Sequence, residues 1–328
     1  MRTEKGGVAH VAITIENDLK DRETKLHKAH ISGLADLSAS VLTCRSANTG
    51  EWMSVMPRIA CTEKAKENYI SRFLANRLID PIDTMRGYIP ELMEMQKQHN
   101  MTVILMLDQS KIADNFECLM ISMRIGERAI PVAWKVVETK GEIGFEIQQE
   151  LLNQVITFIP KDTLILLAAD RFYGTSSLVN WCRQHGWQYR IRLKGNLIFQ
   201  HEGGDITPMD GVKSKLDSMT DAKFNNTEIM TNIGIIWEKG HKEPWFIAMD
   251  CIPSKYKILD YGMRWGIECM FSDFKSRGFS VTKTKLKHVD RIERLILVLT
   301  IALYWAVSTG MQPQSNQANY TKKNSNAH

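Results

Sequence analysis

The sequence predicts an α/β fold in which a mixed β-sheet is flanked by helices, and three observations support this. Two unbroken apolar runs, Thr102–Leu107 and Thr163–Ala169, have the pattern of strands that are buried on both faces. A segment with a helical period, Phe145–Phe158, separates them. Strands without polar positions need helices on both faces of their sheet. The predicted order in this part of the chain is β-β-β-α-β-α-β.

The remaining elements of this order follow from shorter patterns. Cys118–Glu138 predicts two strands that are joined through Gly126–Arg128. Ser176–His185 predicts a helix, and Tyr189–Leu193 predicts another strand.

The first hundred residues predict a helical region. One helix begins after Thr62, a good N-cap, and a second begins at Pro81, which is allowed in a first turn. Two helices around a short turn either contact DNA or pack against the rest of the fold. The sequence leaves both alternatives open.

Composition limits the class of protein. The 328 residues are enough for two domains, or for one catalytic domain with an insertion. The cysteines are scattered and indicate neither disulfides nor a zinc site, which suits a reducing cytoplasm. Residues 1–20 carry charges where a signal peptide needs an apolar run. Leu295–Val307 is apolar but too short to span a bilayer about 30 Å thick, and predicts a buried helix.

The net charge of +5 is concentrated in one segment. From Lys255 to Arg294 there are ten Lys and Arg residues against five Asp and Glu, so the rest of the chain is close to neutral. This location indicates a surface that binds a phosphate backbone. A solvated basic face without a partner is the alternative.

Each apolar run ends at an aspartate, Asp108 or Asp170. A carboxylate at the end of a buried strand is rigidly placed yet reachable, and neighbouring strands can bring two of them together. Two nearby carboxylates repel each other, and a divalent cation removes that conflict. For either aspartate alone, a turn or capping role is the alternative.

The stretch Tyr261–Lys275 places chemically distinct side chains on one face of a predicted helix. At about 100° per residue, a stripe about 60° wide holds Tyr261, Arg264, Glu268 and Lys275. One carboxylate among two cations and a phenol can bind a metal ion and phosphates side by side. The alternative is an amphipathic helix whose charged face is merely solvated.

This stretch resembles the Y-R-E-K signature of bacterial insertion-sequence transposases of the IS-four-type family, DDE enzymes with an RNase H-like catalytic domain. Three other segments are similar to this family: Arg72–Asn76, Asp170–Gly174 and Lys275–Phe279. The predicted order of strands and helices is the order that an RNase H-like fold requires.

The resemblance implies cut-and-paste transposition by phosphodiester hydrolysis and strand transfer. Asp108, Asp170 and Glu268 are then the catalytic metal ligands, holding two Mg²⁺ ions about 3.5–4 Å apart. Carboxylates are hard oxygen donors, which favours Mg²⁺, with Mn²⁺ as a substitute.

The resemblance also implies the partners. These are double-stranded DNA, at terminal inverted repeats and at the target, and a second copy of the chain in a homodimeric synaptic complex. No membrane and no small-molecule substrate are expected, and the location is the bacterial cytoplasm, at the nucleoid. The residues expected to contact DNA are Tyr261, Arg264, Lys275, Arg171 and Arg72.

Two tryptophans complete the set of DNA-binding candidates. Ile229–Trp237 and Pro244–Met249 predict a β-hairpin around Lys239–His241. The family carries a β-rich insertion at this place, and in hairpin-forming relatives an aromatic side chain from it stacks on a flipped nucleotide. Trp237 and Trp245 are the candidates here, and a Trp buried in the hairpin is the ordinary alternative.

The predicted organisation has five parts. Residues 1–98 form a helical region that binds DNA ends. Residues 99–199 and 254–311 form the two parts of the catalytic domain, and residues 200–253 form the β-rich insertion. Residues 312–328 are polar and have the composition of a disordered tail.

Two other functions remain open from the sequence. One is a metal-dependent RNase H-like nuclease or resolvase that cuts DNA without strand transfer. The other is a catalytically silent DNA-binding remnant of an element.

Overall fold

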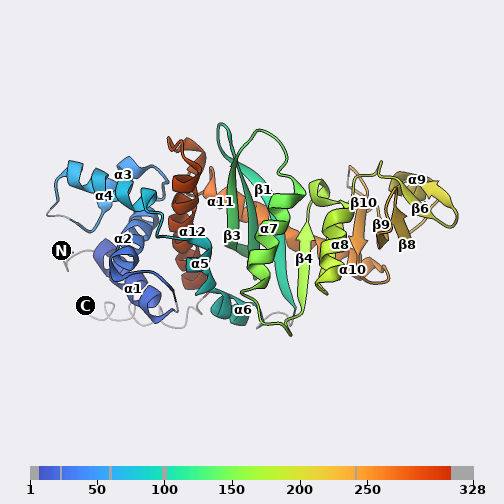
Figure 1. Cartoon of the computed structure of the whole chain (residues 1–328), viewed down its shortest axis with the longest axis horizontal. Coiled ribbons are helices and arrows are strands. Elements are labelled where there is room, and N and C mark those ends of the chain that lie inside the picture. Colours follow the sequence, from blue (N-terminus) through green and yellow to red (C-terminus); the bar gives the residue numbers. More distant parts are fainter. Residues whose placement is uncertain (1–6, 23, 59–60, 98–101, 241, 312–328) are drawn as a thin grey trace, which may run out of the picture.

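The computed structural model describes residues 7–22, 24–58, 61–97, 102–240 and 242–311. The molecule is elongated: the N-terminal helices lie at one end, the sheet in the middle and the insertion strands at the other end (Figure 1). The predicted tail at residues 312–328 lies outside the described residues.

One ten-stranded mixed sheet runs through the molecule, with the order β3-β2-β1-β4-β5-β10-β9-β8-β6-β7. Its first five strands are β1 (Val103–Ala113), β2 (Phe116–Ile125), β3 (Arg128–Glu138), β4 (Ile165–Ala169) and β5 (Gln188–Arg192). β1 to β3 form an antiparallel meander, whereas β4 is parallel to β1 and to β5. The predicted mixed sheet is confirmed and is consistent with an RNase H-like fold.

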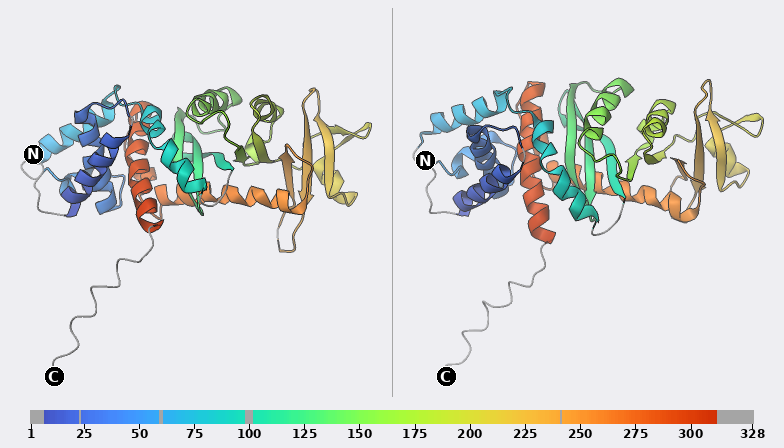
Figure 2. Two further views of the ribbon diagram at one scale, coloured as in Figure 1. Left: turned by 90° about the horizontal axis from the view of Figure 1, so that it is seen from below. Right: turned by 60° about the horizontal axis from the view of Figure 1, so that its bottom comes forward.

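Helices cover both faces of this sheet, which explains the unbroken apolar strands. α7 (Phe145–Ile156) and α8 (Ser176–Gln184) lie on one face, and α11 (Trp265–Phe274) lies on the other (Figure 2). Every residue of β4 is buried. α11 approaches the sheet closely at Gly266, where a Cβ atom would lie 3.2 Å from the carbonyl oxygen of Arg128.

The two strands that carry the aspartates differ in where they end. The prediction that the first strand ends at Asp108 is wrong, because β1 continues to Ala113 in antiparallel register with β2. Residues 108–110 of β1 are half-exposed and Lys111 is exposed, before Ile112 and Ala113 are buried again, so the apolar pattern is interrupted while the ladder continues. Asp170 follows β4 directly, as predicted, and caps the 3-10 helix η1 (Arg171–Tyr173).

The insertion continues the central sheet. Its elements are β6 (Phe199–His201), β7 (Gly204–Ile206), α9 (Pro208–Lys213), β8 (Ser218–Phe224), β9 (Met230–Ile236) and β10 (Trp245–Met249). The predicted hairpin is confirmed as the antiparallel pair β9–β10, although His241 in its loop is outside the described residues. β10 also pairs with β5, so the strands on either side of this contact belong to one sheet.

The signature stretch is not one continuous α-helix, in contrast to the prediction. α10 (Lys255–Leu259) leads into the 3-10 helix η2 (Asp260–Arg264), and only then does α11 begin. Lys275 follows the end of α11. In a 3-10 helix, residues three apart are eclipsed, which aligns Tyr261 with Arg264. The chain then passes through η3 (Val281–Lys283) to α12 (Val289–Met311).

The N-terminal region is helical, as predicted. Its helices are α1 (Gly7–Asp21), α2 (Lys28–Cys44), α3 (Thr49–Val55), α4 (Glu63–Ala75), α5 (Pro81–Arg86) and α6 (Ile89–Lys97). Thr62 caps α4 by accepting a hydrogen bond from the N–H of Ala65. The second predicted helix is divided into α5 and α6 around Gly87–Tyr88.

α12 joins the N-terminal helices to the sheet. Among the described residues it is the helix that is long and apolar enough to cross a membrane, yet 61% of its most apolar window is buried inside the protein. It contacts α2, α4, α5 and β3. The predicted buried helix over Leu295–Val307 is therefore part of a core helix.

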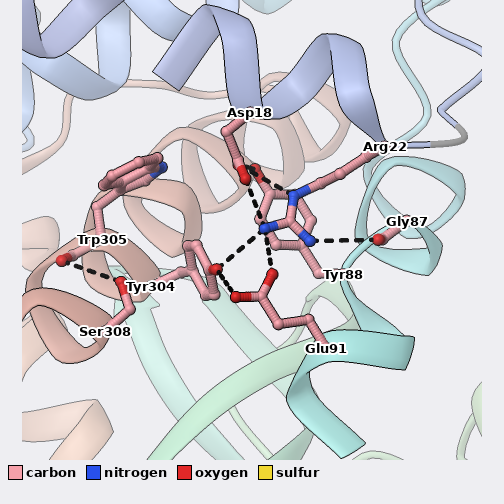
Figure 3. Close-up of polar contacts among 8 residues, drawn as sticks. All are labelled: Asp18, Arg22, Gly87, Tyr88, Glu91, Tyr304, Trp305 and Ser308. Carbon is pink, nitrogen blue, oxygen red and sulfur yellow. Dashed lines mark hydrogen bonds and ion pairs between the residues drawn. The ribbon is translucent and has the colours of Figure 1, made fainter. Parts of the chain in front are cut away.

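An ionic cluster connects α1 and α6 to α12 (Figure 3). Nη2 of Arg22 donates hydrogen bonds to Asp18 (2.7 Å), Glu91 (2.5 Å) and the Tyr304 hydroxyl (2.9 Å). The guanidinium carbon lies 3.7 Å from the ring centroid of Tyr88. A charge taken out of water needs such partners, and the side chain of Arg22 is only 9% exposed. The cluster therefore fixes the N-terminal helices on the rest of the fold.

Replacing Arg22 with alanine should lower the free energy of unfolding by about 1.5–3 kcal/mol, because Asp18 and Glu91 would lose a charged donor. The measurement is urea denaturation of the full chain. Lys25→Ala is the matched control: Lys25 pairs with Asp83 at the exposed surface, and its loss should cost less than about 1 kcal/mol. Equal effects of the two changes would contradict this view of the cluster.

Candidate active site

Asp108 and Asp170 lie next to each other on two parallel strands. Leu107 pairs with Ala169 in the β1–β4 register, so the residues that follow are adjacent at the same edge of the sheet. The pKa of Asp108 is raised to about 6, mainly because the carboxyl is buried. Asp170 and Glu268 add to this rise in pKa, while Arg264 and the N–H of Gln109 oppose it. Asp170 and Glu268 are therefore both close enough to act electrostatically on Asp108.

Arg264 bridges the first and the third of these acids. Its Nη1 donates to Oδ2 of Asp108 at 3.1 Å, and its Nη2 donates to Oε1 of Glu268. Its Nε donates to the Tyr261 hydroxyl at 3.0 Å. The side chain is 8% exposed. Burial lowers the pKa of Arg264, but Tyr261 and the two carboxylates outweigh that effect, and the net pKa is raised.

The acids have the chemistry of a site for a hard divalent cation, but Arg264 already holds two of them. Within the part of the chain that the structure describes, no three His, Cys, Asp or Glu side chains are grouped so that they could hold a metal ion as they stand. Asp108 is 16% and Glu268 39% exposed, so both can be reached from solvent. Carboxylate oxygens fit a hard divalent cation, which would replace Arg264 as the partner of Asp108 and Glu268.

Tyr261 and Lys275 lie at the same edge. Burial raises the pKa of Tyr261 to about 12, so its hydroxyl stays protonated and can donate a hydrogen bond. Nζ of Lys275 donates to the Ser110 hydroxyl at 2.6 Å, on the part of β1 beyond Asp108. Burial lowers the pKa of Lys275, against the opposing effect of Glu117 and Asp108. The structure thus brings the whole signature to the edge that carries the aspartates.

The other predicted DNA-binding residues are placed differently. Arg171 follows Asp170 directly, and the ring of Trp245 packs edge-on to that of Tyr261, with centroids 5.2 Å apart, so both lie beside the acids. Trp237 is 57% exposed after β9 and lines a separate cavity with Lys255. Arg72 is exposed on α4, in the N-terminal region.

Three residues beside the acids were not predicted from the sequence. Arg192 ends β5, and its Nη2 lies 3.3 Å from Oε2 of Glu243. The Tyr173 hydroxyl is buried without a hydrogen-bond partner among the described residues, and burial together with Asp108 and Asp170 raises its pKa. The signal for Arg192 was a charged residue inside an apolar strand pattern. No pattern in the sequence around Glu243 indicates a role in the site.

Residues 147–305 match the family model described as the transposase DDE domain. This match covers just under half of the chain, and it identifies residues 147–305 as a domain of the DDE transposase type. The match spans Asp170 and Glu268, together with the insertion, and begins after Asp108. No curated protein matches the chain.

The transposase domain defines the general activity. Proteins with this domain bind DNA and cleave it with the help of divalent metal ions, so the chain has a function of the transposase or nuclease type. The acids at the edge of the sheet are the hard donors that such metal ions prefer.

Replacing Arg264 with glutamine should destabilise the metal-free protein by about 2–3 kcal/mol, because two neighbouring carboxylates would lose their shared charged donor. The double change Arg264→Gln/Glu268→Gln should recover part of that loss. Unfolding in urea with a chelator present measures both. Arg128→Gln is the control, since Arg128 pairs with Asp273 at the surface and should cost less than about 1 kcal/mol. A double variant less stable than Arg264→Gln alone would contradict the bridging role.

Proposed function

We propose that this protein is a DNA transposase of the IS-four type, which moves an insertion sequence by cutting its ends and joining them to target DNA. The observation that carries the proposal is that Asp108 and Asp170 lie side by side, and that Arg264 links Asp108 to Glu268. The two aspartates come from adjacent parallel strands and Glu268 from a helix on the face of the sheet. The match to the transposase DDE domain supports the same reading.

In this proposal the three acids hold Mg²⁺, as two ions, with Mn²⁺ as a substitute. Bound ions of this kind make water or a 3′-hydroxyl a better nucleophile and stabilise the leaving oxygen. Carboxylate ligands favour these hard cations over softer metals.

The cations of the signature position the DNA. The planar fork of Arg264 fits two phosphate oxygens as well as it fits carboxylates. It can therefore exchange a protein acid for a phosphate. Lys275 offers a point charge beside Ser110, and the protonated Tyr261 hydroxyl supports the Arg264 side chain.

The basic segment after α11 extends this surface toward the N-terminal helices. The N–H of Ala47 donates to the carbonyl of Phe279 at 2.6 Å. Leu286 and Arg291 line a cavity of about 330 Å³ together with Ser71, the neighbour of Arg72 on α4. We therefore infer that terminal inverted repeats lie along this strip, with Arg72 as a contact. A homodimeric synaptic complex and action in the cytoplasm, at the nucleoid, belong to the same proposal.

Incubating the protein with a labelled element end and a target plasmid tests the proposal. A transposase joins the end to the plasmid. A nuclease or resolvase cleaves the end without joining it, and a silent remnant only binds it. Cleavage without any joined product would replace the transposase proposal by the nuclease alternative.

Glu268→Ala should reduce cleavage of element ends by on the order of a thousand-fold or more, as loss of an essential catalytic group does. End binding should remain measurable in a gel-shift assay. Asp273→Asn is the matched control on the same helix, since Asp273 pairs with Arg128 at the surface. Unchanged cleavage by the Glu268 variant would exclude the proposed site.

Lys275→Ala should weaken DNA binding and reduce the slope of log K against log salt by about 1, as loss of one phosphate contact does. Binding titrations at several salt concentrations measure both effects. Lys161→Ala is the control, because Lys161 is exposed and precedes β4, at the end of that strand opposite to Asp170. Identical slopes for the two variants would argue against a phosphate contact at Lys275.

A further inference from the structure

A cavity of about 640 Å³ lies where η1 and the end of β5 meet the insertion. Its basic side chains are Arg171, Arg192, Lys194 and Lys213. Lys213 is paired with Asp210 at 2.9 Å, so these two charges offset each other. Among the described residues that line the cavity, Glu243 is then the carboxylate left to balance the other three cations.

Glu243 holds two of those cations with a single oxygen. Its Oε2 accepts from Nη1 of Arg171 at 3.2 Å and from Nη2 of Arg192 at 3.3 Å. The Glu243 side chain is 61% exposed, just before β10. Ion pairs at this exposure contribute little to stability, so they are easily exchanged. An oxygen anion of similar size, such as a phosphate, is the natural competitor for a guanidinium pair.

The guanidinium pair lies directly beside the acids of the candidate site. Arg171 follows Asp170, and β5, which ends at Arg192, contacts η2, the segment that carries Tyr261. Gly174 keeps η1 against β5, because a Cβ atom there would lie 2.6 Å from the carbonyl oxygen of Arg192. A phosphate on this pair would therefore be close to the second aspartate.

We propose that Glu243 is an internal competitor for DNA, whose carboxylate occupies the Arg171–Arg192 pair that a DNA phosphate takes when the strand enters the site. The inference rests on the proposed function and adds a residue that sets its specificity. A duplex must displace the carboxylate to reach both arginines. DNA held only by weak, general contacts is therefore disfavoured relative to a well-seated element end.

The test is Glu243→Gln, measured by fluorescence anisotropy with a labelled duplex of arbitrary sequence, in the presence of a chelator so that no cleavage occurs. The dissociation constant should fall about three- to ten-fold, because the freed arginines become available to phosphate. Glu228→Gln makes the same change in charge on the insertion, where Glu228 pairs with Lys223, and should change affinity by less than about two-fold.

A second background separates a specific effect from a general change in charge. In the Arg171→Gln/Arg192→Gln protein, adding Glu243→Gln should bring no gain in affinity. Competition by a deoxynucleoside monophosphate distinguishes a free nucleotide from a DNA backbone as the ligand. The proposal would be overturned if Glu243→Gln increased the affinity for the mononucleotide but not for the duplex. It would also be overturned if the Glu243 and Glu228 changes had equal effects on duplex binding.

The wild-type protein gives an independent reference. If the wild-type protein binds the duplex but neither cleaves nor joins it, the proposed transposase activity is contradicted. The comparison of the Glu243 and Glu228 variants then still tests the competitor proposal. If the wild-type protein cleaves and joins DNA but Glu243→Gln does not increase duplex affinity, only the role of Glu243 as a competitor is contradicted.

Discussion

The arrangement of the candidate site depends on one guanidinium group. Arg264 reaches Tyr261, Glu268 and Asp108 at the same time, from the point where η2 passes into α11. In η2, the 3-10 geometry eclipses residues three apart and stacks Tyr261 below Arg264. In α11, residues four apart are neighbours, which brings Glu268 alongside. The third hydrogen bond joins Arg264 to Asp108 on β1.

The frame around this group is held by further buried arginines. Arg294 on α12 donates to the carbonyls of Leu74 and Ile79, at and beyond the end of α4, where helix geometry leaves carbonyls without partners. Arg22 ties α1 and α6 to Tyr304 near the other end of α12. Both arginines stay charged at any physiological pH, so their ability to donate these hydrogen bonds does not change with pH in that range. The N-terminal helices are consequently positioned relative to the sheet by charge as well as by apolar packing.

The sequence was most informative where the structural cause is local. Burial on both faces makes residues 103–107 of β1 and all of β4 apolar without a break, and Asp170 was placed correctly after β4 because that strand ends where its burial ends. The sequence pattern changes at Asp108 although its strand continues, because the burial of the strand changes there while its pairing does not. The bridge from Arg264 to Asp108 spans 156 residues. It depends on the register between strands and on the docking of α11, neither of which leaves a pattern in the sequence.

The same limit explains why Arg192 and Glu243 were missed, and it points to how the site is assembled. Four neighbouring strands, β1, β4, β5 and β10, supply Asp108, Asp170, Arg192 and Glu243 at or just beyond the strand. Because β10 is antiparallel to β5, its beginning lies at the edge where β4 and β5 end. The insertion thus adds a carboxylate next to a cation that the central strands provide. Without DNA, most charges at this edge are paired within the protein. A phosphate must therefore replace an internal partner, and the stability of each internal pair determines how readily DNA is accepted.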